Sequence, residues 1–134
     1  MCPDRVREEV EELVRRGIAV KLVDVNGQCY VLVEGVEAPS PPWSSGRYDI
    51  LIAIPAAYDA AELDGFYVAL PYGYNNGEHS RINGDVIDVL QRKWRRVSWH
   101  YQEGKPWKRG QDSLETHIIH CRGFFLHRGA INER

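Results

Sequence analysis

The chain has 134 residues, 43% of them hydrophobic and 27% charged, and a formal net charge of −2. This size and balance fit one globular domain over residues 1–134 and give no overall positive field to attract nucleic acid. No apolar stretch reaches the roughly 18 residues that a membrane-spanning helix needs, and the charged N-terminus lacks the apolar run of a signal peptide. We therefore expect a cytoplasmic protein with no membrane contact.

Three cysteines, Cys2, Cys29 and Cys121, are spread along the chain without C-x-x-C spacing. An odd number of widely spaced cysteines fits free thiols in a reducing compartment better than a disulfide framework. We expect Cys29 to be packed in a strand. No cofactor is expected.

The first predicted element is a helix over residues 3–17. Four apolar residues recur on one helical stripe: Val6, Val10, Leu13 and Val14. Pro3 and Asp4 are typical of a helix start, and Gly17 is typical of a helix end.

Four β-strands are predicted next, over residues 18–25, 28–36, 47–55 and 65–71. The pair Asn26-Gly27 between the first two indicates a tight hairpin, because a type I′ turn needs positive φ at both central residues. The third strand places alternate large apolar residues on one face: Tyr48, Ile50, Ile52 and Ile54. The pattern predicts an antiparallel meander of four strands.

Two aromatic segments are candidate partner-binding sites. The proline-rich stretch 37–46 is predicted to be a loop that exposes Trp43. The stretch "QRKWRR" gathers basic residues, including Arg95 and Arg96, around Trp94. Such a segment is usually a solvated basic face, but it suits an acidic patch on a partner protein or, as an alternative, single-stranded nucleic acid.

Residues 71–112 are predicted to be mostly irregular, with one or two helical turns or a short strand at 85–94. A second helix follows over 112–129, with Asp112 as its cap and Glu115 as the reciprocal cap. Its apolar stripe consists of Leu114, Ile118, Cys121 and Phe125. The expected fold is α+β: an N-terminal helix, a four-stranded antiparallel meander, a long irregular loop and a C-terminal helix, with the helices on one face.

A metal site on this second helix is one alternative. His117 and Cys121 are four residues apart, and His120 or His127 could join them. Because Cys121 lies on the apolar stripe, we expect it to pack as a small hydrophobic residue, and no metal site is predicted.

The order of elements resembles the ubiquitin-conjugating (E2, UBC) fold. The stretch "YDILIAIPAAYDAAELDGFYVALP" is similar to the family's third strand, P-x-x-Y-P turn and fourth strand, with Pro55 and Tyr58 in place and Asp59 where the second proline would stand. The stretch "KPWKRGQDSLETHI" is similar to the family's tryptophan-led helix after the active site.

The bacterial group called E2 family protein E is the most similar. Its W-x-x-x-S-x-H block is matched by Trp94, Ser98 and His100, with Trp99 between the last two. Its W-x-x-G-x-D-x-L block is matched by residues 107–114. The resemblance covers roughly residues 5–128 and implies a UBC-like fold.

The family's catalytic cysteine has no counterpart. One register places the nucleophile position at Val86; the preferred register takes Trp107 as the family tryptophan and places it near Trp99, His100 and Tyr101. Neither position carries a thiol. The His-Pro-Asn element is also missing: "GYNNGEHSRING" offers asparagines and one histidine without the proline.

The loop therefore has the aromatic frame of an E2 active site without its sulfur. His100 is the candidate catalytic residue, as a general base or a nucleophile; the alternative is a histidine that only orders the loop. Trp99 and Trp107 are expected either to close one end of the core or to contact a partner.

The resemblance implies an E2-like protein of a bacterial ubiquitin-like modification pathway. We expect it to bind a ubiquitin-like protein or an E1-like activating enzyme without forming a thioester, as a scaffold-type pseudoenzyme. Two alternatives remain: an active conjugating enzyme that uses His100 or a displaced cysteine, and a nucleic-acid-binding module that uses the segment around Trp94.

Overall fold

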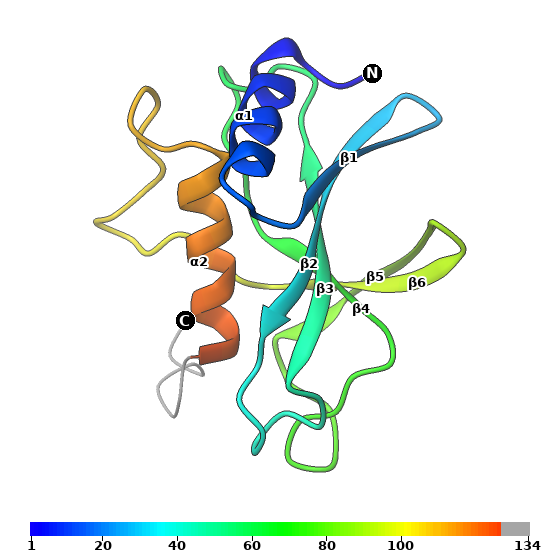
Figure 1. Ribbon diagram of the computed structural model, residues 1–134. Coiled ribbons are helices and arrows are strands. Elements are labelled where there is room, and N and C mark those ends of the chain that lie inside the picture. The colour runs from blue at the N-terminus through cyan, green and yellow to red at the C-terminus, as the bar shows by residue number, and fades with distance from the viewer. Residues whose placement is uncertain (127–134) are drawn as a thin grey trace.

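A computed structural model describes residues 1–126 and shows two helices and six strands (Figure 1). The helices are α1 (Asp4–Arg15) and α2 (Leu114–Leu126). The strands are β1 (Val20–Val25), β2 (Gln28–Glu37), β3 (Arg47–Ile54), β4 (Phe66–Ala69), β5 (Ile82–Val89) and β6 (Arg92–Val97). Within these residues no helix is long and apolar enough to cross a membrane.

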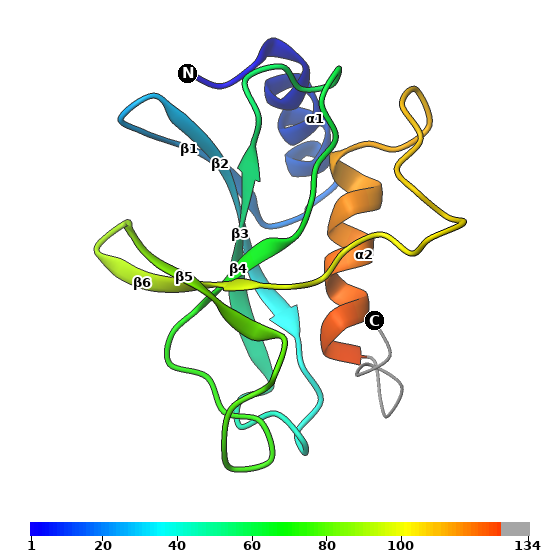
Figure 2. The ribbon, with the colours of Figure 1, turned by 180° about the vertical axis from the view of Figure 1, so that it is seen from behind.

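The fold is α+β, as predicted, with one antiparallel sheet in the order β1-β2-β3-β4-β6-β5. Both helices pack against the same face of that sheet (Figures 1 and 2). The sheet has six strands and not the predicted four, because part of the segment expected to be irregular forms the hairpin β5–β6 beside β4.

The hairpin β5–β6 turns at Leu90 and Gln91, whose φ angles are 58° and 59°. Two positive φ angles define the tight turn that the twist of a hairpin favours, but asparagine and glycine are the residues that usually signal it. The indole N–H of Trp94 donates a 2.8 Å hydrogen bond to the carbonyl of Val89. Packing and this bond hold a turn that has no sequence signature.

The first hairpin agrees with its sequence signal. Asn26 and Gly27 have φ angles of 51° and 85°, and β1 pairs with β2 from Val25↔Gln28 outwards. The predicted face of β3 is buried in the main core, beneath the two helices.

Helix α1 buries Val6, Val10 and Leu13, whereas Val14, predicted to share this stripe, is 52% exposed. Glu9 fixes the helix to its surroundings. Its two carboxylate oxygens accept hydrogen bonds from the Tyr58 hydroxyl (2.6 Å) and from the backbone N–H of Leu114 (3.3 Å).

Helix α2 buries all four predicted stripe residues. Its cap is different from the prediction: Ser113 and Thr116 bond reciprocally between side chain and backbone, at 2.8 and 3.4 Å. Asp112 instead accepts a hydrogen bond from the backbone N–H of Lys108 at 2.6 Å. The part of the predicted helix at 127–129, including His127, lies outside the described residues.

The predicted exposure of Trp43 is wrong: its side chain is 1% exposed. Its indole N–H donates to the carbonyl of Phe125 at 3.1 Å, and its ring stacks on His79, with centroids 5.7 Å apart. Burial lowers the pKa of His79 to about 4, so this ring is neutral near pH 7. Trp43 thus anchors the proline-rich loop to the core instead of presenting a contact surface.

The prediction of free thiols is wrong for two of the three cysteines. Cys2 and Cys29 form a disulfide that joins the residues before α1 to β2, and both are at most 5% exposed. The pairing depends on the return of the chain from α1 to the sheet, which cysteine spacing does not reveal. Because the expected cytoplasmic location was supported by the assumption of free thiols, that location remains a prediction.

Candidate functional site

The loop between β6 and α2 runs beside the start of α2 and carries the candidate residues. Burial alternates along its first part: Trp99 is 7% exposed and Tyr101 is half-buried, whereas His100 is exposed. In an extended chain, alternate side chains point to opposite sides. The two aromatic rings therefore face α2, and His100 faces outwards.

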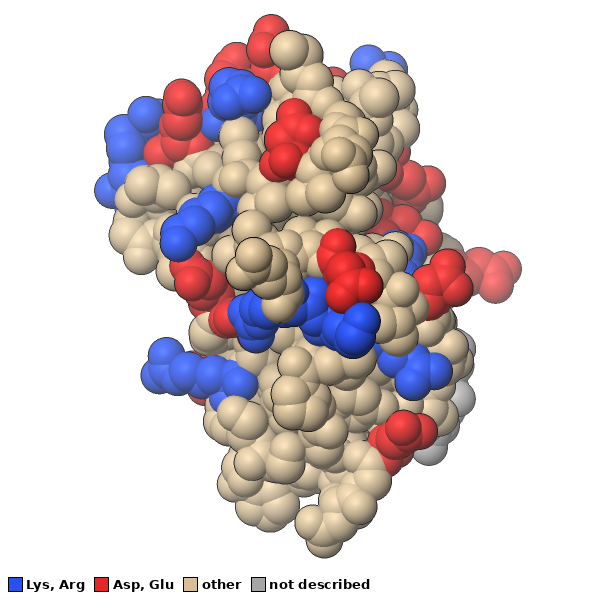
Figure 3. Space-filling view, turned by 90° about the vertical axis from the view of Figure 1, so that its right-hand side faces the viewer, with Lys and Arg blue, Asp and Glu red and all other residues tan. Residues whose placement is uncertain are grey.

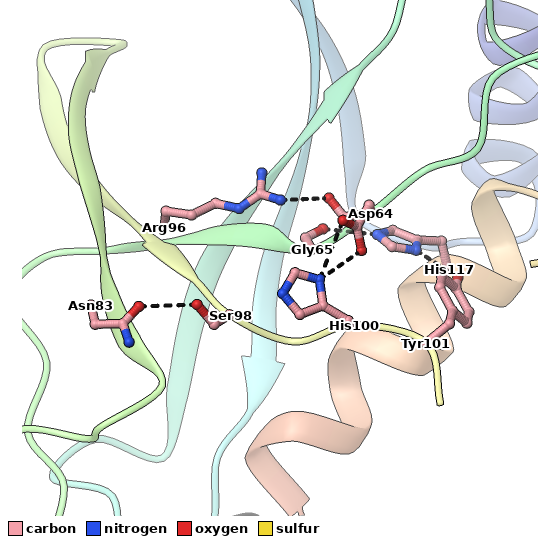
Figure 4. A network of polar contacts seen from close by, with 8 residues as sticks. All are labelled: Asp64, Gly65, Asn83, Arg96, Ser98, His100, Tyr101 and His117. Carbon is pink, nitrogen blue, oxygen red and sulfur yellow. Dashed lines mark hydrogen bonds and ion pairs between the residues drawn. The ribbon is translucent and has the colours of Figure 1, made fainter. Parts of the chain in front are cut away.

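His100 has an acidic partner (Figure 4). Its Nδ1 lies 3.1 Å from Asp64 Oδ1 and 3.3 Å from Asp64 Oδ2, and the two side chains are 56% and 45% exposed. The guanidinium of Arg96 donates a hydrogen bond to the backbone carbonyl of Asp64 at 3.1 Å and so holds the backbone of that residue in place. When the ring is neutral and its Nδ1–H donates to Asp64, Nε2 is the nitrogen that can accept a proton.

A second histidine is enclosed beneath this pair. His117 is fully buried; its Nε2 lies 2.8 Å from the Gly65 carbonyl and its Nδ1 lies 2.7 Å from the Tyr101 hydroxyl (Figure 4). A carbonyl can only accept, so Nε2 carries the proton and Nδ1 accepts from the tyrosine. Burial lowers the pKa of His117 to about 4 and raises the pKa of Tyr101. Both groups are neutral and hold the loop against α2.

The two loop tryptophans have different environments. Trp99 donates its indole N–H to the carbonyl of His120 at 2.8 Å and is part of the main core. Trp107 is half-buried and makes edge-to-face contacts with Tyr101 and Tyr58 at centroid distances of 5.8 and 6.5 Å. Trp99 therefore closes the core, and Trp107 leaves part of its surface to solvent.

None of the three cysteine sulfur atoms is accessible at this loop. Cys2 and Cys29 are bonded to each other, and Cys121 is completely buried on α2. Burial raises the pKa of the Cys121 thiol, so it is a poor source of thiolate. Among residues 1–126 no group of three His, Cys, Asp or Glu side chains could hold a metal ion.

The basic segment around Trp94 does not form a stacking surface. Trp94 is fully buried, in a second apolar cluster on the sheet face that the helices leave uncovered, and Arg92 lies over its ring at 4.8 Å. Arg95 pairs with Val68 and Arg96 with Tyr67, so the two arginines point to opposite faces of the sheet. On the face shown in Figure 3, basic and acidic groups are interspersed. This arrangement does not favour nucleic acid.

Val86, the nucleophile position in the less favoured register, lies in β5 and is 48% exposed. It belongs to a paired strand and not to the loop before α2.

Asp64 and Tyr101 are two polar residues of the site whose functional contacts the sequence did not indicate. Asp64 is 36 residues from His100, and only the course of the chain from β4 to the end of β6 brings them together.

The fold and the loop define a class: an α+β protein in which one antiparallel sheet and two helices present an aromatic loop with a His–Asp pair and no accessible thiol. A family model described as prokaryotic E2 family E matches residues 6–125, most of the chain. The chain belongs to this family, which confirms the resemblance seen in the sequence. Neither the curated proteins nor the solved structures gave a match.

Proposed function

We propose that this chain is an E2-like protein of a bacterial ubiquitin-like modification pathway and that it works there by non-covalent binding. Its partners would be a ubiquitin-like protein and an E1-like activating enzyme, bound by one UBC-like domain over residues 1–134 in the cytoplasm. Membership of the prokaryotic E2 family supports the pathway.

The inaccessibility of every cysteine sulfur carries the non-covalent part of the proposal. A thioester carrier needs an exposed, ionisable thiol. The disulfide removes Cys2 and Cys29, and burial removes Cys121. Reduction would free two thiols that are still at most 5% exposed and that lie on the N-terminal segment and β2, away from the loop.

Calorimetry with a cognate bacterial ubiquitin-like protein tests this binding. We expect saturable heat at micromolar concentrations. Arg109→Glu, on the exposed part of the loop, should weaken binding, whereas Arg7→Glu, on the exposed face of α1, should leave it unchanged. No heat at high micromolar concentrations would contradict the proposal.

The Asp64–His100 pair favours a second candidate, a conjugating enzyme in which His100 acts as a general base or a nucleophile. A carboxylate on Nδ1 orients the ring and leaves Nε2 free to accept a proton. Incubation with an E1-like enzyme, ATP and the ubiquitin-like protein, followed by intact-mass measurement, tests this. An adduct lost in His100→Ala and kept in Cys121→Ala would support it; the absence of any adduct removes it.

A further inference from the structure

Strand β2 runs past the end of its neighbour β1. Val20 is the first residue of β1, and just before it the carbonyl of Ala19 accepts a 3.0 Å hydrogen bond from the N–H of Glu34. The chain before these residues belongs to α1 and its last turn, whereas β2 continues to Glu37 and still pairs with β3 there. Among the described residues, positions 35–37 therefore have a strand on one side only, and their other edge is open.

A cavity of about 480 Å³ lies at this open edge, between the segment that joins α1 to β1 and the C-terminal end of α2. Figures 1 and 2 both show the end of β2 beside the last turn of α2. The larger apolar side chains of the lining are those of Ile18, Val33, Val36 and Leu126. Ligand pockets are roughly 300–1,000 Å³, so this volume holds a few residues of an incoming chain.

A bulge at Gly35 keeps the open edge approachable. Its φ is 68°, and its N–H donates at 2.9 Å to the side chain of Asp49. A Cβ at this glycine would stand 3.8 Å from Nη1 of Arg47, so that guanidinium lies directly beside the edge. Another backbone can therefore come close to β2 here, next to a cation.

The charges at the cavity are unbalanced. Arg47 and Arg122 are both exposed, and throughout residues 1–126 no carboxylate lies within ion-pair distance of either guanidinium. Of the two lining carboxylates, Glu34 is held by Lys21 at 3.5 Å. Glu37 alone is then set against two guanidinium groups, which favours an occupant that carries negative charge.

We propose that this cavity binds an extended acidic segment of another protein, which adds to the open edge of β2 as a further strand. Backbone hydrogen bonds to residues 35–37 would supply affinity, and the alternate side chains of the segment would supply specificity. Its carboxylates meet Arg47 and Arg122, and its apolar side chains lie on Val36 and Leu126. No residue of the loop between β6 and α2 lines the cavity, so the inference does not depend on the proposed function.

Nuclear magnetic resonance titration of the whole chain tests the charge preference with two peptides: acetyl-Thr-Asp-Val-Asp-Val-Asp-Thr-amide, and the same peptide with lysine in place of aspartate. We expect the acidic peptide to shift the backbone signals of Gly35 and Glu37 and to bind at least about fivefold more tightly than the basic one. Arg47→Glu and Arg122→Glu should each remove that preference. Arg7→Glu, on the exposed face of α1 and outside the cavity, is the matched control and should keep it.

Two N-methylated forms of the acidic peptide test the backbone pairing. Alternate N–H groups of a strand point to opposite edges. Methyl groups on one alternate set should therefore weaken binding at least about tenfold, and methyl groups on the other set should leave it nearly unchanged.

Equal weakening by the two methylated sets, equal affinity for the acidic and basic peptides, or no shift at millimolar peptide would each overturn the inference. An effect of Arg7→Glu as large as that of Arg122→Glu would do the same. A concentration-dependent dimer that Arg122→Glu dissociates would also overturn it, because the occupant would then be a second copy of this chain.

Discussion

Removal of the Cys2–Cys29 disulfide should lower the free energy of unfolding by about 3.5 kcal/mol. The bond closes a loop with a sequence separation of 27 residues. Cross-linking a loop of that length removes roughly 12 cal/mol/K of entropy from the unfolded chain, which is about 3.5 kcal/mol at 25 °C. Folded domains have only about 5–15 kcal/mol of stability, so this loss is large.

Urea unfolding with and without a reducing agent measures the effect. The oxidised wild type should lose about 3.5 kcal/mol on reduction. Cys2→Ala should be insensitive to the reducing agent, because it has no bond to break, whereas Cys121→Ala should keep the wild-type sensitivity. Intact mass should show a gain of about 2 Da on reduction of the wild type, from the two hydrogen atoms (two electrons and two protons) that the disulfide gains.

If the wild type were equally stable in both conditions and gained no mass, the cysteines would be free thiols. The sequence-based expectation would then be right, and the tie between the N-terminal segment and β2 would be absent from the protein in solution.

Two further predictions concern polar groups that are buried or partly buried. Glu9→Gln should cost about 1.5–3 kcal/mol in urea unfolding, because charge-assisted hydrogen bonds link this carboxylate to Tyr58 and to the first turn of α2; Glu8→Gln, on the exposed side of α1, should change stability little. His79 and His117 both have a folded pKa of about 4, below the unfolded value of about 6.5. Their contribution to the free energy of unfolding is therefore fully present above pH 6.5 and is lost as the pH decreases towards 4. The loss is up to about 1.4 kcal/mol per pH unit for each ring. His117→Gln should remove about half of that slope. A slope unchanged by His117→Gln would contradict the assignment.

Local signals in the sequence predicted the elements that depend on local chemistry. Asn26-Gly27 specified the first hairpin, and alternation along β3 specified its buried face. All four residues predicted for the stripe of α2 are buried, whereas His117 and Phe124, which are buried on the same helix, were not predicted. The hairpin β5–β6 was missed because its turn at Leu90-Gln91 is held by tertiary packing.

The candidate site was only partly predictable. The sequence identified His100 and the loop, but not Asp64, which approaches from the segment before β4. It assigned exposure to Trp43 because proline-rich segments are usually at the surface, whereas this one is held against α2 by the Trp43 indole. Trp94 and Trp99 are core residues, and of the four tryptophans only Trp107 is partly exposed.

Native mass spectrometry of the chain with an E1-like enzyme, ATP and a ubiquitin-like protein tests the central claim most directly. With every cysteine sulfur buried or bonded, we predict a complex of the chain and the ubiquitin-like protein under native conditions, and the unmodified chain alone after denaturation. An adduct that survives denaturation and is released by a thiol or by hydroxylamine would show covalent transfer and contradict the account.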